Sequence, residues 1–176
     1  KKNILLFAIL LASCTAPVEE PKGVGFWAAD AEETFVLGSD ETTQVFNDFM
    51  EAHNNRDTDL IKSMETEDIH IELPDGTVID GQAQHMEALG SFFDADAQWL
   101  PYWGMPYKGV KNGVEWMIAG MAITTLVDGE ETTVLHMVDA ELENGLFKNP
   151  IINNEAINDT KIINVILLII CISIFN

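Results

Sequence analysis

The sequence predicts an α+β domain in which helices pack on one face of a curved antiparallel sheet. Three observations lead to this prediction. Apolar residues recur at helical spacing in the first half of the chain, two long strand-like segments follow at residues 114–127 and 132–142, and only a short turn separates them. Strands that run together after helices indicate a helical layer on a sheet, rather than alternating strands and helices.

The early elements are predicted in the order helix, short helix, strand, helix. Ser39 caps the first helix ahead of two acidic residues, and Asp57 caps the second. Residues 69–73 alternate between apolar and polar side chains, which predicts a strand, and a Pro-Asp-Gly turn follows it. A third helix is expected over residues 82–93, with one apolar side.

The segment after the third helix is rich in aromatic residues and interrupted by prolines, so an irregular connection is expected there. The strand at residues 114–127 that follows is apolar on both faces. We therefore expect one of its faces to cover the helices while the other lines a cavity.

Residues 1–13 have the order of a secretory signal peptide: two lysines, an apolar run too short to span a bilayer, and small residues. Residues 11–14, Leu-Ala-Ser-Cys, resemble the lipobox of bacterial lipoproteins. This resemblance implies that Cys14 carries acyl chains and anchors the protein in a membrane of the cell envelope. Thr15 rather than Asp follows the cysteine, which in enterobacterial lipoproteins implies the outer membrane, on either its periplasmic or its outer side.

After the lipid attachment point, the chain divides into a tether rich in proline and glycine at residues 14–38, a domain at residues 39–145, and an Ile- and Asn-rich tail at residues 146–176. The tail begins without alternation and contains Pro150, so no regular final strand is expected there. Two interpretations of the tail stay open. One is a disrupted reading frame or assembly error, and the other is a genuine membrane-associated segment.

The net charge of −20 limits which molecules the chain is expected to bind. Nucleic acids and anionic lipid head groups would be repelled at long range, so neither is expected to bind. The chain length suits a single domain with one substantial core.

The layout is similar to that of the nuclear transport factor 2-like superfamily, in its SnoaL-like branch. The similarity covers residues 40–145 and rests on three segments in this order: FMEAHNNRDTDLIKSM, EDIHIELPDGTVIDG and VDAELENG. It implies a cone-shaped fold with an apolar pocket between helices and sheet. Domains of this kind are enzymes or non-catalytic binders and often dimerise through the sheet, so a homodimer is an expected partner. The family's last strand should follow the turn at residues 144–145.

Ketosteroid isomerases of this fold use a carboxylate base, with a Tyr and a protonated Asp as oxyanion donors. The resemblance places the oxyanion Asp at Asp139, the Tyr at Phe49 and the base at Leu73. Phe49 has no hydroxyl to donate, and Leu73 cannot take a proton. Isomerase chemistry of that kind is therefore not expected, and whether the chain is an enzyme stays open.

Two catalytic candidates remain. Asp139 shares a strand face with Leu135 and Met137, and if that face lines the pocket, burial would raise its pKa and make it an acid or base. The other interpretation is a strand end near solvent. His70 and Glu72 share the polar side of the first strand, where they either orient a proton-transfer group or form an exposed face.

The remaining histidines are not expected to act on a ligand. His136 lies on the face opposite Asp139, where it would pack or form an interface, and His53 and His85 are expected on the surface. The four histidines of the chain show no ligand spacing, so we expect no metal site and no cofactor.

Ligand binding is favoured by the aromatic residues of the proline-interrupted segment, because Trp and Tyr combine a broad apolar surface with a polar tip. The predicted pocket lining is Phe49, Leu73, Trp99, Tyr102, Trp103, Trp116, Met117, Leu135 and Met137. Three functions follow. The leading one is a membrane-tethered module that binds a small apolar or amphipathic molecule. The second is an enzyme for proton transfer or hydrolysis through Asp139 and His70, and the third is an envelope domain whose sheet face dimerises or docks a partner.

Overall fold

A computed structural model of the protein describes residues 22–154. Its elements in chain order are β1 (Phe35–Leu37), α1 (Asp40–Asn55), α2 (Thr58–Ser63), β2 (His70–Glu72), β3 (Val78–Asp80), α3 (Gly81–Asp94), β4 (Gln98–Gly109), β5 (Glu115–Val127), β6 (Glu130–Glu143) and β7 (Leu146–Asn154). The predicted helices and the two long strands are all present, within about two residues of the expected bounds.

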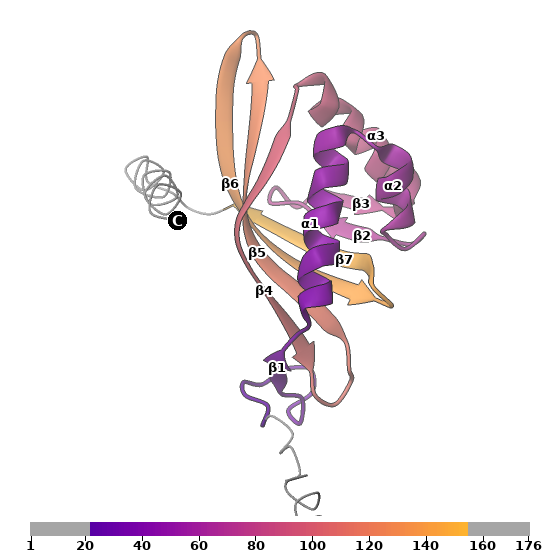
Figure 1. Cartoon of the computed structure of the whole chain (residues 1–176), viewed down its shortest axis with the longest axis vertical. Helices are drawn as coiled ribbons and strands as arrows, with labels where there is room; N and C mark the ends of the chain where they lie inside the picture. The colour runs from indigo at the N-terminus through magenta and orange to yellow at the C-terminus, as the bar shows by residue number, and fades with distance from the viewer. Residues whose placement is uncertain (1–21, 155–176) are drawn as a thin grey trace, which may run out of the picture.

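The seven strands form one sheet in the order β1-β4-β5-β6-β7-β2-β3. Neighbouring strands are antiparallel except β2 and β7, which are parallel. Figure 1 shows that the sheet is curved, that all three helices lie on one side of it, and that the turn between β5 and β6 lies at the end opposite β1. The architecture is therefore the predicted α+β arrangement of helices on a curved antiparallel sheet.

Capping determines where the first two helices begin. The Ser39 hydroxyl accepts the backbone N–H of Thr42, and the Asp57 carboxylate accepts that of Leu60. Both caps agree with the predictions from the sequence, since each side chain satisfies an N–H that the helix itself leaves unbonded. The hydroxyls of Ser39 and Thr42 also donate to the Glu115 carboxylate, which joins the start of α1 to the start of β5.

The core lies between the helices and the face of the sheet that they cover. On β5, the side chains at positions 117, 119, 121 and 123 are buried on this inner face, while the alternate positions 116, 118 and 122 lie on the outer face. The strand is apolar on both faces, as the sequence indicates. The expected division of roles is wrong, however, because Met121 and Ile123 of the helix-covered face also line the cavity described below.

The aromatic segment after α3 is a strand, β4, and not an irregular connection. Its prolines fit because β4 has β5 on only one side along most of its length. Pro106 accepts a hydrogen bond from Gly38 N–H on the side away from β5. Because N and O of one strand residue point the same way, the missing N–H of Pro106 leaves no β5 hydrogen bond unmade. The other proline, Pro101, lies next to a register shift between Pro101 and Trp103, where the regular ladder of hydrogen bonds is interrupted.

Residues 146–154 form the last strand, so the expectation that no regular strand follows the turn is wrong. β7 pairs with β6 on one side and with β2 on the other. A register shift opposite Glu141 and Leu142 leaves Lys148 of β7 as an extra residue, which lets Phe147, Pro150 and Ile152 all face the core or the cavity. That shift interrupts the alternation of the sequence, which is why the segment does not resemble a strand. The domain therefore continues through residue 154, beyond the predicted end at residue 145.

The residues before α1 are partly attached to the sheet rather than forming a simple tether. β1 pairs with the end of β4, and the buried Glu33 carboxylate accepts the backbone N–H groups of Lys111 and Asn112 in the turn before β5. These hydrogen bonds lower the pKa of Glu33, the bond from Lys111 most of all. The segment 22–38 is thus part of the folded domain.

Several predictions fall outside the described residues. The signal peptide, Cys14 and the first part of the tether lie within residues 1–21, and most of the Ile- and Asn-rich tail lies within residues 155–176. The two interpretations of the tail stay predictions for residues 155–176. Within residues 22–154, no helix is long and apolar enough to cross a membrane.

Candidate functional site

A cavity of about 100 Å³ lies between α1, α3 and the inner face of the sheet. Its walls are mostly apolar side chains from these two helices and from six strands, β2 to β7. The residues that form the walls are Phe46, Phe49, Met50, His53, Ile71, Leu73, Ile79, His85, Ala88, Leu89, Phe92, Trp99, Met121, Ile123, Val138, Ala140, Phe147, Pro150 and Ile152. Within the described part of the chain, only His53, His85 and Trp99 of this lining have a nitrogen in the side chain.

His53 and His85 were expected on the surface, and the structure contradicts this. They are 4% and 6% exposed, and their rings lie with centroids 5.7 Å apart in the cavity wall. Helical spacing explains both positions. His53 follows Phe49 by four residues on α1, and His85 precedes Leu89 by four on α3, so each imidazole lies on the apolar side of its helix. This spacing is the signal in the sequence that could have placed them.

Glu65 is a member of the site that the sequence analysis did not single out. It follows α2, is 2% exposed, and its Oε2 lies 2.7 Å from Nδ1 of His85. No residue of the described segment hydrogen-bonds to its other carboxylate oxygen. A carboxylate is costly to bury without a partner, so the imidazole of His85 is what makes this position tenable.

His53 is held as a neutral imidazole. Its Nδ1 lies 2.7 Å from the Phe49 carbonyl oxygen. A carbonyl only accepts, so Nδ1 carries the hydrogen and Nε2 keeps a lone pair. Burial lowers the pKa of His53 to about 4, the bond to the carbonyl opposes that shift, and the nearby His85 adds to it.

Asn54 positions the aromatic wall of the cavity. Its amide donates to the carbonyl oxygen of Trp99 at 2.9 Å and its side-chain oxygen accepts the N–H of Trp99 at 2.7 Å. These two bonds occupy the edge of β4 where no strand pairs with it. The Trp99 ring then packs beside His53, with centroids 5.3 Å apart, and beside Phe92 at 5.9 Å.

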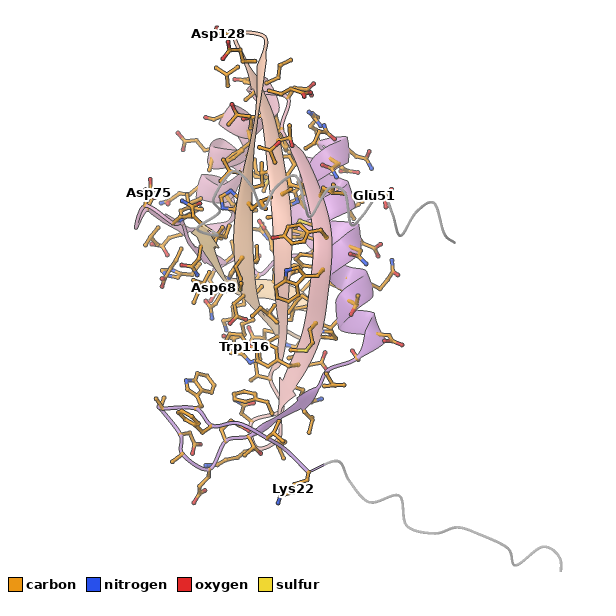
Figure 2. All side chains as sticks on the ribbon, turned by 90° about the vertical axis from the view of Figure 1, so that its left-hand side faces the viewer. Lys22, Glu51, Asp68, Asp75, Trp116 and Asp128 are labelled. Atoms are coloured by element: carbon orange, nitrogen blue, oxygen red, sulfur yellow. The ribbon has the colours of Figure 1, made fainter. Side chains whose placement is uncertain are left out.

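Of the predicted pocket lining, Phe49, Leu73 and Trp99 line the cavity. Met117 is buried in the core, and with Tyr102 and Trp103 it borders a shallow groove between α1 and β4 instead. Leu135, Met137 and Trp116 lie on the outer face of the sheet, because their positions alternate with those of the inner face. Figure 2 looks onto the side of the sheet opposite the helices and shows Trp116 there.

Asp139 also lies on the outer face, together with Leu135 and Met137 as the sequence predicted, but this face does not line the cavity. Its Oδ1 accepts a hydrogen bond of 2.9 Å from the Tyr107 hydroxyl. Burial raises the pKa of Asp139, and the bond from Tyr107 opposes that rise. The Tyr107 ring stacks on Trp116. Asp139 was predicted to act as an acid or base only if its strand face lined the pocket, and that face does not.

His70 lies on β2 with its side chain directed away from the cavity, since its neighbour Ile71 points inward. Its Nδ1 is 2.6 Å from Asp80 and its Nε2 is 3.7 Å from Glu72, and all three side chains are well exposed. This agrees with the exposed-face interpretation of the first strand. In the described part of the chain, no group of three or more His, Cys, Asp or Glu could hold a metal ion.

No protein-family model matches the chain, and no curated protein sequence matches it. Solved structures do match. A Kribbella flavida protein proposed to be a ketosteroid isomerase aligns with a TM-score of 0.57 and 17% identity, over 70% of this chain and 84% of its own. A Jannaschia sp. CCS1 protein proposed to be a SnoaL-like polyketide cyclase gives 0.54 and 9% identity, over 66% and 86%.

A third match is SalBIII, described as an epoxide hydrolase/cyclase-like enzyme with a role in forming the pyran ring of the polyether salinomycin. It aligns with a TM-score of 0.54 and 20% identity, over 66% of this chain and 92% of its own. At such low identities these likenesses show the fold alone. They confirm the predicted fold class, helices on a curved antiparallel sheet with a pocket between them.

Proposed function

We propose that this chain, which has the nuclear transport factor 2-like fold, binds a small and largely apolar molecule in its cavity and moves a proton on it. His85 is the acid–base group, and Glu65 orients it. Nε2 of His85 takes a proton from one atom of the ligand and returns it to another, so the ligand is isomerised and no co-reactant is consumed. The observation that carries the proposal is the buried Glu65–His85 pair beside an otherwise apolar cavity.

The Glu65–His85 pair suits this role for two reasons. The carboxylate bound to Nδ1 fixes the imidazole tautomer, which leaves the lone pair of Nε2 available, and it stabilises the imidazolium that forms when Nε2 takes a proton. The surroundings are mostly apolar, so each electrostatic interaction in the cavity is stronger than in solvent. Buried ionisable pairs beside a cavity are common in active sites.

The names of the matched structures support the same class of reaction, because they describe isomerising or ring-forming proteins. In this chain, a reaction of that class would use residues other than the Tyr and the carboxylate base of the ketosteroid isomerases. Phe49 and Leu73 both line the cavity but neither carries a proton-transfer group. Binding without chemistry is the alternative, and these two apolar side chains favour it.

The test follows deuterium incorporation from heavy water into cyclohexane-1,2-dione, a small uncharged carbon acid, by mass spectrometry. We expect the purified chain to accelerate the exchange, and Glu65→Gln and His85→Asn to reduce that acceleration by at least about tenfold, since positioned acid–base groups contribute about 10²–10⁴-fold. Both replacements keep a hydrogen-bonding side chain in place. Asp139→Asn, on the outer face, is the matched control and should exchange at the unaltered rate.

A dione that binds without accelerated exchange would overturn the catalytic proposal and leave the binding alternative. Equal loss of exchange in Asp139→Asn would assign the effect to general destabilisation rather than to His85.

We also propose that Cys14 anchors the protein in the cell envelope, at the outer membrane. The support is the order of the N-terminal sequence, a lysine pair, an apolar run and Leu-Ala-Ser-Cys. Expression in a bacterium, followed by mass spectrometry of the N-terminal peptide, should reveal acyl chains on Cys14 and none in Cys14→Ala. Detection of an unmodified Cys14 thiol in the membrane fraction would contradict the proposal.

A further inference from the structure

We infer that the ligand of this cavity is an uncharged molecule of the size of one six-membered ring that carries a hydroxyl group, a phenol or an enol. This inference rests on the proposed function, because it names the ligand class of the same site. Three properties of the cavity lead to it: its volume, its lack of charged side chains, and the direction of its hydrogen bonds.

The volume limits the ligand to one ring. A cavity of about 150 Å³ in another protein holds benzene, and the present cavity has about 100 Å³. Part of its wall is the stacked pair Phe49 and Phe147, whose centroids lie 4.3 Å apart. Such close packing opposes enlargement of the cavity, because the two rings cannot move apart without displacing their neighbours. Fused ring systems are therefore too large for the cavity as it stands.

The lining excludes a charged ligand. Of the cavity-lining residues, all within the described segment, none is Asp, Glu, Lys or Arg. A charged ligand would lose its hydration without finding a counter-charge. Anions would in addition be repelled by the net charge of −20.

The two imidazoles determine which hydrogen bonds a ligand can make. Nδ1 of His53 donates to the Phe49 carbonyl, and Nδ1 of His85 donates to Glu65. In their uncharged forms, both rings keep a lone pair on Nε2, because the hydrogen lies on Nδ1. Because both histidines line the cavity, we assign these two Nε2 lone pairs as the acceptors for a ligand, which an ether or a hydrocarbon cannot satisfy.

A hydroxyl group matches this arrangement best. It donates to an imidazole Nε2, which neither an ether nor a hydrocarbon can do. An enol hydroxyl also supplies the proton that the proposed reaction transfers. The O–H proton passes to Nε2 of His85, and a proton then passes from that nitrogen to the enol carbon, which leaves the ketone.

The experiment compares phenol with toluene, which have nearly the same shape and differ in one hydroxyl. Affinities are measured by calorimetry on the purified full chain at about pH 8, above the ordinary pKa of histidine. We expect phenol to bind at least about tenfold more tightly than toluene, although toluene is the more hydrophobic, because unpaired buried acceptors penalise toluene. Anisole, which cannot donate, should bind as weakly as toluene, and 1-naphthol at least about tenfold more weakly than phenol.

The matched variant replaces His53, His85 and Glu65 by Leu together, so that no buried polar partner is left unpaired. We expect it to prefer toluene over phenol. His53→Leu alone, with the Glu65–His85 pair intact, should reduce the preference for phenol and gives the comparison if the triple variant does not fold. Asp139→Asn should retain the preference of the unaltered chain.

The outcomes separate this inference from the proposed function. Toluene or anisole binding as tightly as phenol overturns the hydroxyl requirement, and 1-naphthol binding as tightly as phenol overturns the size limit. Phenol binding with no accelerated deuterium exchange in cyclohexane-1,2-dione leaves this inference standing and overturns the catalytic proposal. No binding of any of the four compounds overturns both.

Discussion

His53 lies four residues after Phe49 on α1, and that spacing places its imidazole among apolar side chains rather than in water. Burial disfavours the charged imidazolium, so the ring stays neutral although its Nδ1–H donates to a carbonyl. The neighbouring His85 adds a further penalty if both rings become charged. One residue is thereby kept as a permanent hydrogen-bond acceptor in the cavity.

This neutrality makes the stability of the fold depend on pH. Above about pH 6.5 His53 is uncharged in both the folded and the unfolded chain, and it contributes no pH dependence. Below that value the unfolded chain binds a proton that the folded chain refuses until about pH 4. The free energy of unfolding should therefore decrease by about 1.4 kcal/mol for each pH unit by which the pH is lowered from about 6.5 to about 4.

The measurement is urea unfolding of the unaltered chain and of His53→Gln at several pH values. The difference in free energy of unfolding between the two proteins isolates His53, because Glu65, His85 and the surface carboxylates are common to both. A difference that stays constant across the window would contradict the assignment of His53 as a buried neutral ring.

At the scale of elements, β7 completes both the sheet and the cavity. It lies between β6 and β2, and it supplies Phe147, Pro150 and Ile152 to the cavity wall. Phe147 is 1% exposed and contacts two rings of α1, those of Phe46 and Phe49. Without this strand, β6 and β2 would each have an unpaired edge, and the Glu65 backbone would lose its bridge to Phe147.

We expect Phe147→Ala to lower the free energy of unfolding by about 3–5 kcal/mol, because it removes a buried ring and leaves a cavity. Ile151→Ala is the matched control on the same strand. Ile151 is partly exposed on the outer face, so its loss should cost less than about 1.5 kcal/mol. Urea unfolding followed by circular dichroism measures both. Equal small effects would mean that residues 146–154 do not belong to the core.

At the scale of the whole molecule, the two sides of the sheet differ. One side is covered by helices, while the outer side exposes large apolar residues of β4 and β7, among them Leu100, Trp103, Met105 and Ile151. In the described segment no helix covers this outer side. An apolar face on a chain of net charge −20 favours association through that face, because charge opposes contact elsewhere. A second copy is the partner that we expect.

We therefore expect a dimer in sedimentation velocity, measured on Cys14→Ala to exclude association through lipid. Met105→Glu, with Met105 45% exposed on the outer face, should shift the chain to a monomer. Leu60→Glu is the control, since Leu60 is 43% exposed on α2 at the helical side and should leave the dimer intact. A monomeric Cys14→Ala chain at the highest attainable concentration would contradict the prediction.

Local patterns predicted the helices, their caps and the two long strands, because each depends on residues a few positions apart. They failed for β4 and β7, where the alternation is interrupted by prolines and by register shifts against a neighbouring strand. They also misplaced His53 and His85. Imidazole is classed as polar, yet both residues lie on the apolar side of a helix. Whether such a position is buried or exposed to solvent depends on which elements pack against that side of the helix.

The sequence alone determined the class of fold, the helix boundaries and the acidic character of the chain, since composition and short-range spacing are sufficient for these. Only the tertiary structure decided which face of the sheet lines the cavity. Alternation along β6 places Asp139 with Leu135 and Met137, but it cannot say which of two opposite faces the helices will cover. The meeting of Glu65, in the segment after α2, with His85 of α3, 20 residues later in the chain, is likewise a property of packing.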